Sequence, residues 1–253
     1  VPVHYAGIAC EMDTIMDIAN RHDIPVIEDN AHGLFGKYKN QWLGTIGCMA
    51  TQSFHETKNF TCGEGGAILI NDRGLIEKAE IIREKGTDRS RFFRGQVDKY
   101  SWVSVGSSYL LADILAGFLY AQLEEWEEIQ AKRKWIWQTY ANELDSWAKA
   151  NNVIQPTIPE GIDPSWHIYY LLLPDLDQRQ RFISHLKESG INSVFHYLPL
   201  HLSEKGKEYG GKPGDMPVTE SISDRLVRLP LYYDIGEIEM EQTLKAVTAF
   251  KTG

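Results

Sequence analysis

The sequence contains few cysteines, and none of them belongs to a paired motif. Cys10, Cys48 and Cys62 are separated along the chain, without a C-x-x-C pair. A disulfide framework and a thiolate zinc site both need closely patterned cysteines, so neither is expected. Three unpaired thiols instead favour a protein of the reducing cytoplasm.

Long apolar runs and an excess of basic residues are also missing. No run reaches about 18 consecutive apolar residues and no signal-peptide pattern is present, so we expect a soluble, cytoplasmic protein without membrane contact. The formal net charge is -9. Non-specific binding to nucleic acid needs a basic face, so nucleic acid is not an expected partner.

An initial methionine is absent as well. The chain opens with Val1-Pro2-Val3-His4, which reads as the middle of a strand rather than as a start. We therefore expect a fragment, or a product that lacks an N-terminal segment.

Strand and helix patterns alternate over residues 1–70. Residues 13–22 carry apolar side chains at helical spacing, and Asp13 is available as the N-terminal cap. Apolar extended runs lie at 1–5, 24–27, 49–54 and 67–70. Strands that alternate with helices predict a largely parallel α/β sheet.

The second half of the chain has a different pattern. From Leu115 to Ile129, leucines, Trp126 and Ile129 recur at spacings of three and four, which predicts a long helix that connects to a second unit. A strand at 166–173, a helix at 178–188 and a strand near 194–197 then predict a smaller α+β domain. We place the boundary between 1–128 and 129–253.

Polar side chains close two of the predicted strands in the first half. Asp29 ends the run 25–29, Ser53 ends the run 49–53, and Lys58 follows in a polar loop. Ligands of open α/β sheets lie beyond the carboxyl ends of the strands. Taken singly, such an Asp is more often a turn former, such a Lys is usually solvated, and Gly63-Glu64-Gly65-Gly66 can be a simple tight turn.

Together these residue types fit the chemistry of pyridoxal phosphate (PLP). A lysine amine forms a Schiff base with the cofactor and later moves a proton. A carboxylate beside the pyridine nitrogen keeps that nitrogen protonated, so the ring acts as an electron sink. A serine hydroxyl near backbone N–H groups suits a phosphate.

Ordered motifs along the whole chain resemble the DegT-type sugar-nucleotide aminotransferases, a PLP family of fold type I. Ile-Glu-Asp-Asn-Ala-His at 27–32 is similar to the family's Glu-Asp-x-Ala-Gln/His segment. Ser-Phe-His-Glu-Thr-Lys at 53–58 and Gly-Glu-Gly-Gly at 63–66 look like its Ser-Phe-x-x-x-Lys and Gly-Glu-Gly-Gly elements. Further similar segments are 2–4, Arg83 with Gly86, 122–123, 196–201 and 229–231.

The resemblance implies an α/β fold of the aspartate aminotransferase type. Residues 1–128 would form the C-terminal portion of its large, PLP-binding domain, and 129–253 its small C-terminal α+β domain. The family's N-terminal part, which normally supplies a Gly-Thr phosphate-binding turn and an aromatic ring on the cofactor, has no counterpart in this sequence. The resemblance also implies a homodimer with shared active sites.

Site residues follow from the resemblance position by position. Lys58 would be the Schiff-base lysine and the general acid–base, and Asp29 would pair with the pyridine nitrogen. His32 would lie near the ring's 3-hydroxyl, and Ser53 would bind the phosphate. Ser108 stands where the family commonly has an Asn that reaches the phosphate of the partner subunit's cofactor, and Leu110 stands where it has an Arg.

The implied reaction moves an amino group from glutamate to a dTDP-4-keto-6-deoxy sugar, giving a dTDP-4-amino-4,6-dideoxy sugar. Two alternatives remain open: a PLP sugar 3-dehydratase of the same family, which would carry His in place of Lys58, and a truncated or inactive PLP-fold protein without turnover.

A metal site built from the histidines is disfavoured, because His196 and His201 are separated by Pro199. The basic stretch from Arg83 to Arg94 is either a solvated loop, which we favour, or a diphosphate-binding loop.

Overall fold

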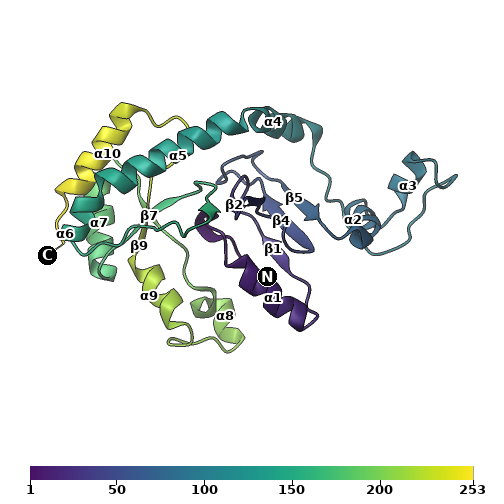
Figure 1. Ribbon diagram of the computed structural model, residues 1–253, viewed down its shortest axis with the longest axis horizontal. Helices are drawn as coiled ribbons and strands as arrows, with labels where there is room; N and C mark the ends of the chain where they lie inside the picture. Colours follow the sequence, from purple (N-terminus) through teal and green to yellow (C-terminus); the bar gives the residue numbers. More distant parts are fainter. Residues whose placement is uncertain (253) are drawn as a thin grey trace. The chain divides into compact units, whose positions relative to one another are not determined.

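The computed structural model describes residues 1–252 as two compact units (Figure 1). The first unit contains Val1–Trp126 and Glu160–Ser165, and the second contains Glu127–Pro159 and Trp166–Gly253. The boundary predicted after residue 128 is a single cut in the sequence, whereas the chain returns to the first unit once more at Glu160–Ser165.

A three-stranded sheet is the scaffold of the first unit. Its strand order is β1-β4-β5, formed by β1 (Ile27–Asp29), β4 (Met49–Ser53) and β5 (Gly66–Ile70). β1 and β4 are parallel, with Asp29 opposite Thr51, and Val3 adds a parallel bridge to Asp29 on the other side of β1. Only this point of the extended run expected at 1–5 pairs with the sheet, because a 3-10 turn, η1 (Tyr5–Gly7), follows at once.

The expectation of a largely parallel sheet is wrong for β5. β4 and β5 are antiparallel, with Ser53 opposite Gly66. The connection 54–65 contains no crossover helix, and without one two strands can pair only in antiparallel fashion. Hydrogen bonds from Phe54 N to Gly65 O and from Glu56 N to Gly63 O, both 2.8 Å, continue the pairing into this loop.

Helix α1 (Met12–Arg21) matches the helix expected at 13–22 and closes the first core. Its buried Met12 and Ala19 pack with Val26, Tyr38 and Leu43. A second small sheet has the order β3-β2-β6, formed by β3 (Gln41–Trp42), β2 (Lys37–Tyr38) and β6 (Ile162–Asp163). β6 belongs to the returning segment, and its pairing with β2 anchors that segment to the first unit.

The remaining elements of the first unit are helical. They are η2 (Arg73–Leu75), α2 (Ile76–Arg83), α3 (Arg89–Phe93) and α4 (Asp113–Glu124). The helical pattern that starts near Leu115 forms two helices rather than one, since α4 ends at Glu124 and α5 (Trp126–Glu143) begins after Glu125.

The second unit packs helices against a three-stranded antiparallel sheet of order β7-β9-β8. Its strands are β7 (Tyr169–Leu172), β9 (Leu226–Leu229) and β8 (Val194–Phe195). Its helices, besides most of α5, are α6 (Asp145–Ala150), α7 (Leu176–Glu188), η3 (Leu200–Leu202), α8 (Glu204–Glu208), α9 (Pro217–Arg225) and α10 (Glu237–Ala249). The strand and helix expected at 166–173 and 178–188 are present as β7 and α7.

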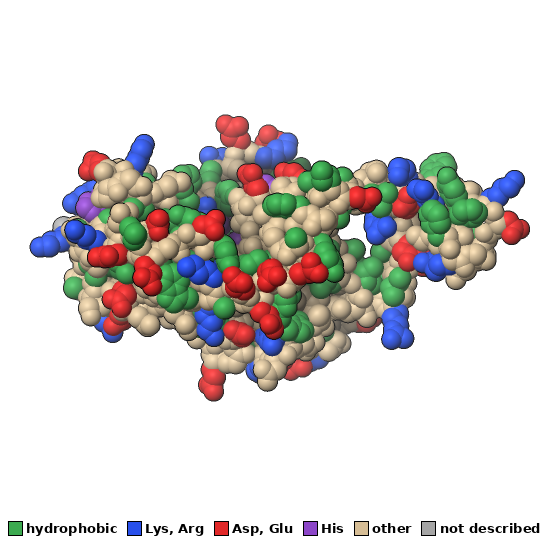
Figure 2. Space-filling model, turned by 90° about the horizontal axis from the view of Figure 1, so that it is seen from above, with side chains coloured by type: hydrophobic (Ala, Val, Ile, Leu, Met, Phe, Trp, Pro, Cys, Tyr) green, Lys and Arg blue, Asp and Glu red, His purple; other side chains and the backbone are tan. Residues whose placement is uncertain are grey.

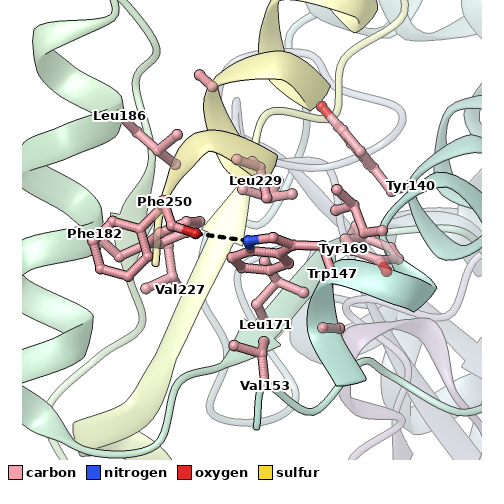
Figure 3. Packing of buried hydrophobic residues seen from close by; sticks show 14 of the residues in the cluster. Tyr140, Trp147, Val153, Tyr169, Leu171, Phe182, Leu186, Val227, Leu229 and Phe250 are labelled. Atoms are coloured by element: carbon pink, nitrogen blue, oxygen red, sulfur yellow. Dashed lines mark hydrogen bonds between the residues drawn. The ribbon is translucent and has the colours of Figure 1, made fainter. Parts of the chain in front are cut away.

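An aromatic core holds this second unit together (Figure 3). Tyr140, Tyr169 and Phe182 are fully buried. The buried Trp147 donates its indole N–H to the carbonyl of Phe250 at 2.8 Å, which satisfies its polar group inside the core. Asp175 accepts a hydrogen bond from Gln178 N at 2.8 Å and so caps the N-terminus of α7.

Across residues 1–252, the helices fall short of the length and apolar character needed to span a membrane.

Candidate active site

The carboxyl ends of β1 and β4 bring two of the predicted site residues to one edge of the sheet. Asp29 is the last residue of β1 and Ser53 the last of β4, and the two strands run parallel. The backbone of Asp29 is held on its outer side by hydrogen bonds with Pro2 O and His4 N. Both predicted residues therefore stand at the edge where ligands bind in sheets of this kind.

Lys58 is presented by the loop between β4 and β5. Its N–H donates to His55 O at 2.9 Å, and Thr57 N donates to the ring nitrogen Nδ1 of His55 at 3.3 Å. Cys62 N closes the far side of the loop on Phe54 O at 2.9 Å. These local bonds shape the turn that carries Lys58, while its side chain remains half-buried.

Three predicted site residues line one recess. The recess has an empty volume of about 190 Å³ and is partly open to solvent. Its lining residues are Ala31, His32, Leu34, Gln52, Ser53, Lys58, Asn59 and Phe60.

Asp29 acts electrostatically on the same recess. Burial lowers the pKa of the Lys58 amine below its usual value, and the negative charge of Asp29 offsets part of that effect. The carboxylate is itself oriented by the backbone, since its Oδ1 accepts a hydrogen bond from Ala31 N at 3.1 Å. An amine with a lowered pKa is more often neutral, which is the form that acts as a nucleophile.

His32 is held from two directions. Its ring nitrogen Nδ1 accepts a hydrogen bond from Ala6 N at 3.3 Å, and its backbone carbonyl accepts one from the Ser165 hydroxyl. The ring of Tyr5 lies 5.5 Å from the His32 ring, centroid to centroid. Because the backbone N–H of Ala6 occupies Nδ1, the proton of a neutral His32 ring is on Nε2.

A fully buried carboxylate, Glu28, lies one residue before Asp29. It accepts hydrogen bonds from His4 Nε2 (2.9 Å), Gly44 N (2.8 Å), Ile46 N (2.7 Å) and Gly47 N (2.7 Å). Burial alone would raise the pKa of Glu28, but the bonds from His4 and from these backbone N–H groups outweigh it and lower the pKa. His4 Nδ1 accepts from Cys10 N at 3.2 Å, so the ring carries its proton on Nε2 and donates it to Glu28.

Ser108 lies outside this recess. It is exposed and forms an isolated antiparallel bridge with Glu84, next to α2. The structure therefore brings together Lys58, Ser53 and His32, with Asp29 acting on Lys58, and leaves Ser108 apart from them within this chain.

The basic stretch that follows α2 is largely committed to ion pairs. Arg94 contacts Glu80 with two hydrogen bonds of 2.8 Å, Arg89 contacts Glu84 at 2.9 Å, and Arg91 contacts Glu77 at 3.4 Å. Guanidinium groups paired in this way are less available to an anionic ligand. Over residues 1–252, no group of three His, Cys, Asp or Glu side chains is arranged to hold a metal ion.

Sequence reasoning missed three residues that build the recess. Gln52 lines the recess, is buried and accepts a hydrogen bond from Asn30 Nδ2 at 3.0 Å. Asn59 also lines the recess. Ser165 forms hydrogen bonds with Asn59 and with the carbonyl of His32, which both belong to its lining. Asn59 follows Lys58 directly, so its position next to that lysine was a usable signal. Ser165 is 106 positions from Asn59, and no local pattern marks it.

The residues around the recess fit PLP by the chemistry of their functional groups. An amine on Lys58 can hold the aldehyde carbon, and the Asp29 carboxylate can pair with a protonated ring nitrogen. Among residues 1–252, the one hydrogen bond to Ser53 Oγ is a long one of 3.4 Å from His55 N, so this hydroxyl retains capacity for a phosphate oxygen. Imidazole at His32 can contact the ring hydroxyl.

Known proteins are similar to this chain over nearly its whole length. An uncharacterized protein of Methanocaldococcus jannaschii, MJ1066, is 36% identical over 255 residues, which cover 98% of this chain and 65% of that protein. A DegT DnrJ EryC1 StrS aminotransferase from Brucella abortus has a TM-score of 0.86 at 28% identity, over 99% of this chain and 64% of that one. The chain thus spans slightly less than two thirds of the length of these relatives.

A third similar structure bears on the cofactor. Spr1654 from Streptococcus pneumoniae, assigned as a sugar aminotransferase and solved in its PLP form, has a TM-score of 0.85 at 25% identity, over 98% of this chain and 67% of that one. These similarities confirm the predicted fold and indicate pyridoxal phosphate as the cofactor, as the sequence predicted. The family model for DegT/DnrJ/EryC1/StrS aminotransferases matches residues 1–248. The chain therefore belongs to the DegT/DnrJ/EryC1/StrS aminotransferase family.

Proposed function

We propose that this protein is a PLP-dependent aminotransferase that moves the amino group of glutamate to a dTDP-4-keto-6-deoxy sugar. The product would be a dTDP-4-amino-4,6-dideoxy sugar. The observation that carries the proposal is the convergence of Lys58, Ser53 and His32 on one recess, with the Asp29 charge acting on the Lys58 amine. Family membership supports the same reaction class.

The sugar is proposed from two further segments of sequence. Lys-Gly-Thr-Asp-Arg-Ser at 85–90 and Gly-Ser-Ser-Tyr-Leu at 106–110 resemble the dTDP-4-amino-4,6-dideoxygalactose transaminase of enterobacterial common antigen synthesis. Both segments lie in the first unit, where Lys85 N donates to Ser107 O at 3.0 Å and links them. This pairing makes the two motifs one local structure, and we assign to it the choice of substrate.

Four residues of this chain would have separate roles in the reaction. When bound, PLP supplies an electron sink that stabilises negative charge on the carbon losing a proton. Lys58 would hold the cofactor through its Nζ, then take and return the proton as general base and acid. Asp29 would keep the ring nitrogen protonated, His32 would orient the ring through its hydroxyl, and Ser53 would bind the phosphate.

The state of the Lys58 amine suits this role. Burial lowers its pKa, which moves the amine toward the range in which it can both accept and donate a proton near neutral pH. Asp29 limits the shift because its negative charge favours the protonated amine. The two residues thus oppose each other, and the balance between them sets how much neutral amine is present.

Two alternatives make different predictions. A PLP sugar 3-dehydratase of this family would carry His at position 58, so the lysine at that position favours the aminotransferase. A truncated or inactive protein would fold but would neither hold PLP covalently nor turn over. Product analysis with glutamate and the keto sugar separates these outcomes, because only an aminotransferase leaves the amino group on the sugar.

We propose the cytoplasm as the location and nucleotide sugar and glutamate as the small-molecule partners. Cys10, Cys48 and Cys62 are all free thiols, which suits a reducing compartment. The net charge of -9 disfavours nucleic acid as a partner.

We also propose that two copies of the chain associate. Helix α4 is apolar around most of its circumference, yet Leu119 is its one buried residue, while Ile114 is 82% and Phe118 60% exposed. A helix that is hydrophobic on all sides is normally covered.

Exposed apolar residues extend from α3 to α4 as the 93–120 apolar segment: Phe93, Tyr100, Trp102, Val103, Val105, Tyr109, Leu110, Ile114, Phe118 and Tyr120. Figure 2 shows hydrophobic side chains at the surface around α2 and α3.

The double substitution Ile114→Glu and Phe118→Glu is expected to weaken dimerisation by about 100-fold or more, since apolar anchors of interfaces are each worth roughly 2 kcal/mol or more. Sedimentation velocity over a concentration series measures this change. Ile24→Glu is the matched control, because Ile24 is also exposed (59%) but lies outside the 93–120 apolar segment. A double variant that dimerises like the unsubstituted chain would contradict the proposal.

Asp29→Asn is expected to slow amino transfer from glutamate by roughly 10- to 100-fold. The substitution replaces a charged partner of the ring nitrogen by a neutral one, and hydrogen bonds to charged groups are worth about 1.5–3 kcal/mol. The affinity for PLP should change less, because Lys58 and Ser53 remain. Stopped-flow absorbance of the glutamate half-reaction, together with a PLP titration, measures both quantities. An unchanged half-reaction rate would refute the role of Asp29.

The direct test of the proposed function is purification of the chain with PLP, followed by incubation with glutamate and dTDP-4-keto-6-deoxyglucose. We expect a visible absorption band that glutamate removes and the keto sugar restores, with formation of an amino sugar nucleotide detected by mass spectrometry. A chain that retains no PLP, or whose spectrum does not respond to glutamate, would overturn the proposal.

A further inference from the structure

Ser165 stands between two walls of the recess although it is far from them in sequence. It ends the segment Glu160–Ser165, which returns to the first unit after an excursion through the second. The residue is fully buried. A buried serine at the end of such a segment has a defined set of partners, and here these partners belong to the recess.

All three polar groups of Ser165 are used. Its hydroxyl donates to the carbonyl of His32, and its own carbonyl accepts a hydrogen bond from Asn59 Nδ2 at 2.7 Å. Its N–H donates to Gly7 O at 3.1 Å. His32 and Asn59 both line the recess, so one serine fixes two of its walls.

The turn at residues 5–7 contacts both Ser165 and His32. Gly7 has φ +82°, and a Cβ at this position would collide with Ser165 Oγ, so glycine is required by conformation and by space. The preceding residue, Ala6, donates its N–H to the ring of His32. The turn therefore holds the ring of His32 while Ser165 holds its backbone.

The residues that follow Ser165 are fixed as well. Trp166 has φ +55°, a left-handed conformation that is rare for a bulky residue and persists only where its surroundings impose it. Within the second unit, Arg133 donates to the carbonyls of Trp166 (3.0 Å) and His167 (2.6 Å). This constrained stretch of backbone begins directly after Ser165 in the chain.

We propose that Ser165 is a positioning residue for the PLP site: it sets the placement of His32 and Asn59 and, through them, the affinity for the cofactor. The inference rests on the proposed function for its link to PLP, but the placement of His32 is a property of the chain alone. Ser165 itself lines no part of the recess and would act only through its two partners.

The test compares Ser165→Ala with Ser193→Ala. Ser193 is also buried, and its hydroxyl has no hydrogen-bond partner among residues 1–252, so its removal is a matched control. In the cofactor-free protein, NMR of the histidine rings should show shifted His32 signals in Ser165→Ala. The rings of His185 and His201, and all rings in Ser193→Ala, should stay as they are.

PLP titration provides the second readout. Loss of one hydrogen bond should raise the dissociation constant about five- to tenfold in Ser165→Ala, against less than about twofold in Ser193→Ala. Ser165→Cys keeps a similar side-chain size and a weak donor. Its PLP dissociation constant should therefore lie between those of Ser165→Ala and Ser193→Ala. Should Ser165→Ala fail to fold, Ser165→Cys decides the question by the same NMR and affinity measurements.

The outcomes separate this inference from the proposed function. Unchanged His32 signals in Ser165→Ala and Ser165→Cys would overturn the positioning role, whatever the protein binds. Shifted His32 signals with an unchanged PLP dissociation constant would overturn the link to the cofactor. A chain that binds no PLP would refute the proposed function, while the NMR comparison would still decide whether Ser165 positions His32.

Discussion

Lys58→Ala is expected to abolish amino transfer, with a fall in rate of about 10⁴-fold or more, because it removes both the covalent attachment point and the group that moves the proton. The fold should survive, since Lys58 lies in a loop, is half-buried and contributes no part of either hydrophobic core. Single-turnover kinetics with glutamate measures the loss, and circular dichroism with thermal unfolding confirms that the variant is folded.

Two further variants sharpen this experiment. Lys58→Arg keeps a positive charge but provides no nucleophilic amine, so it should be as inactive as Lys58→Ala. Lys78→Ala, on the exposed face of α2, is the control for loss of a lysine outside the recess and should keep full activity. Transamination that persists in Lys58→Ala would refute the assignment of this residue.

Glu28→Gln is expected to lower the free energy of unfolding by about 1–3 kcal/mol, the usual cost of leaving buried hydrogen-bonding groups without a partner. The reason lies in the donors around the carboxylate. Glu28 accepts from His4 and from three backbone N–H groups, and an amide nitrogen in place of one oxygen would meet donors instead of acceptors. A change of the His4 tautomer cannot relieve this clash, because a proton on Nδ1 would then face Cys10 N–H.

Chemical denaturation of Glu28→Gln measures the loss, with Glu241→Gln on the exposed side of α10 as control. The pH dependence gives an independent check. The folded-state pKa of Glu28 is lowered, so its contribution is fully present above its unfolded value of about 4.3 and is lost as the pH falls through the lower folded value. The acid-side loss of stability should therefore be smaller in Glu28→Gln. A variant as stable as the control would contradict the role given to this pair.

The sequence predicted that Asp29, Ser53 and Lys58 lie near one edge of the sheet, because this argument is local and topological. Asp29 and Ser53 each close a strand, and neighbouring parallel strands necessarily end at one edge of a sheet. Lys58 follows Ser53 within the same short loop, so its proximity needed no long-range information. The family and the cofactor were predicted from the same segments, and the comparisons confirm both.

What the sequence could not predict depends on contacts between distant segments. The direction of β5 does not follow from the sequence, because a glycine-rich segment has the pattern of a simple break, whereas its hydrogen bonds continue the pairing of β4 with β5. The role of Glu28 does not follow from its motif, because no local pattern identifies His4, 24 positions away, as its partner. Ser165 was missed for the same reason: its partners come from the start of the chain and from the lysine loop.

We propose that the amine of Lys58, on which the Asp29 charge acts, is the group that holds PLP. Reductive trapping with borohydride after incubation with PLP, followed by peptide mass spectrometry, tests it most directly. We expect a single pyridoxyl adduct on the peptide that contains Lys58, and none in Lys58→Ala. An adduct on a different lysine, or no adduct at all, would contradict it.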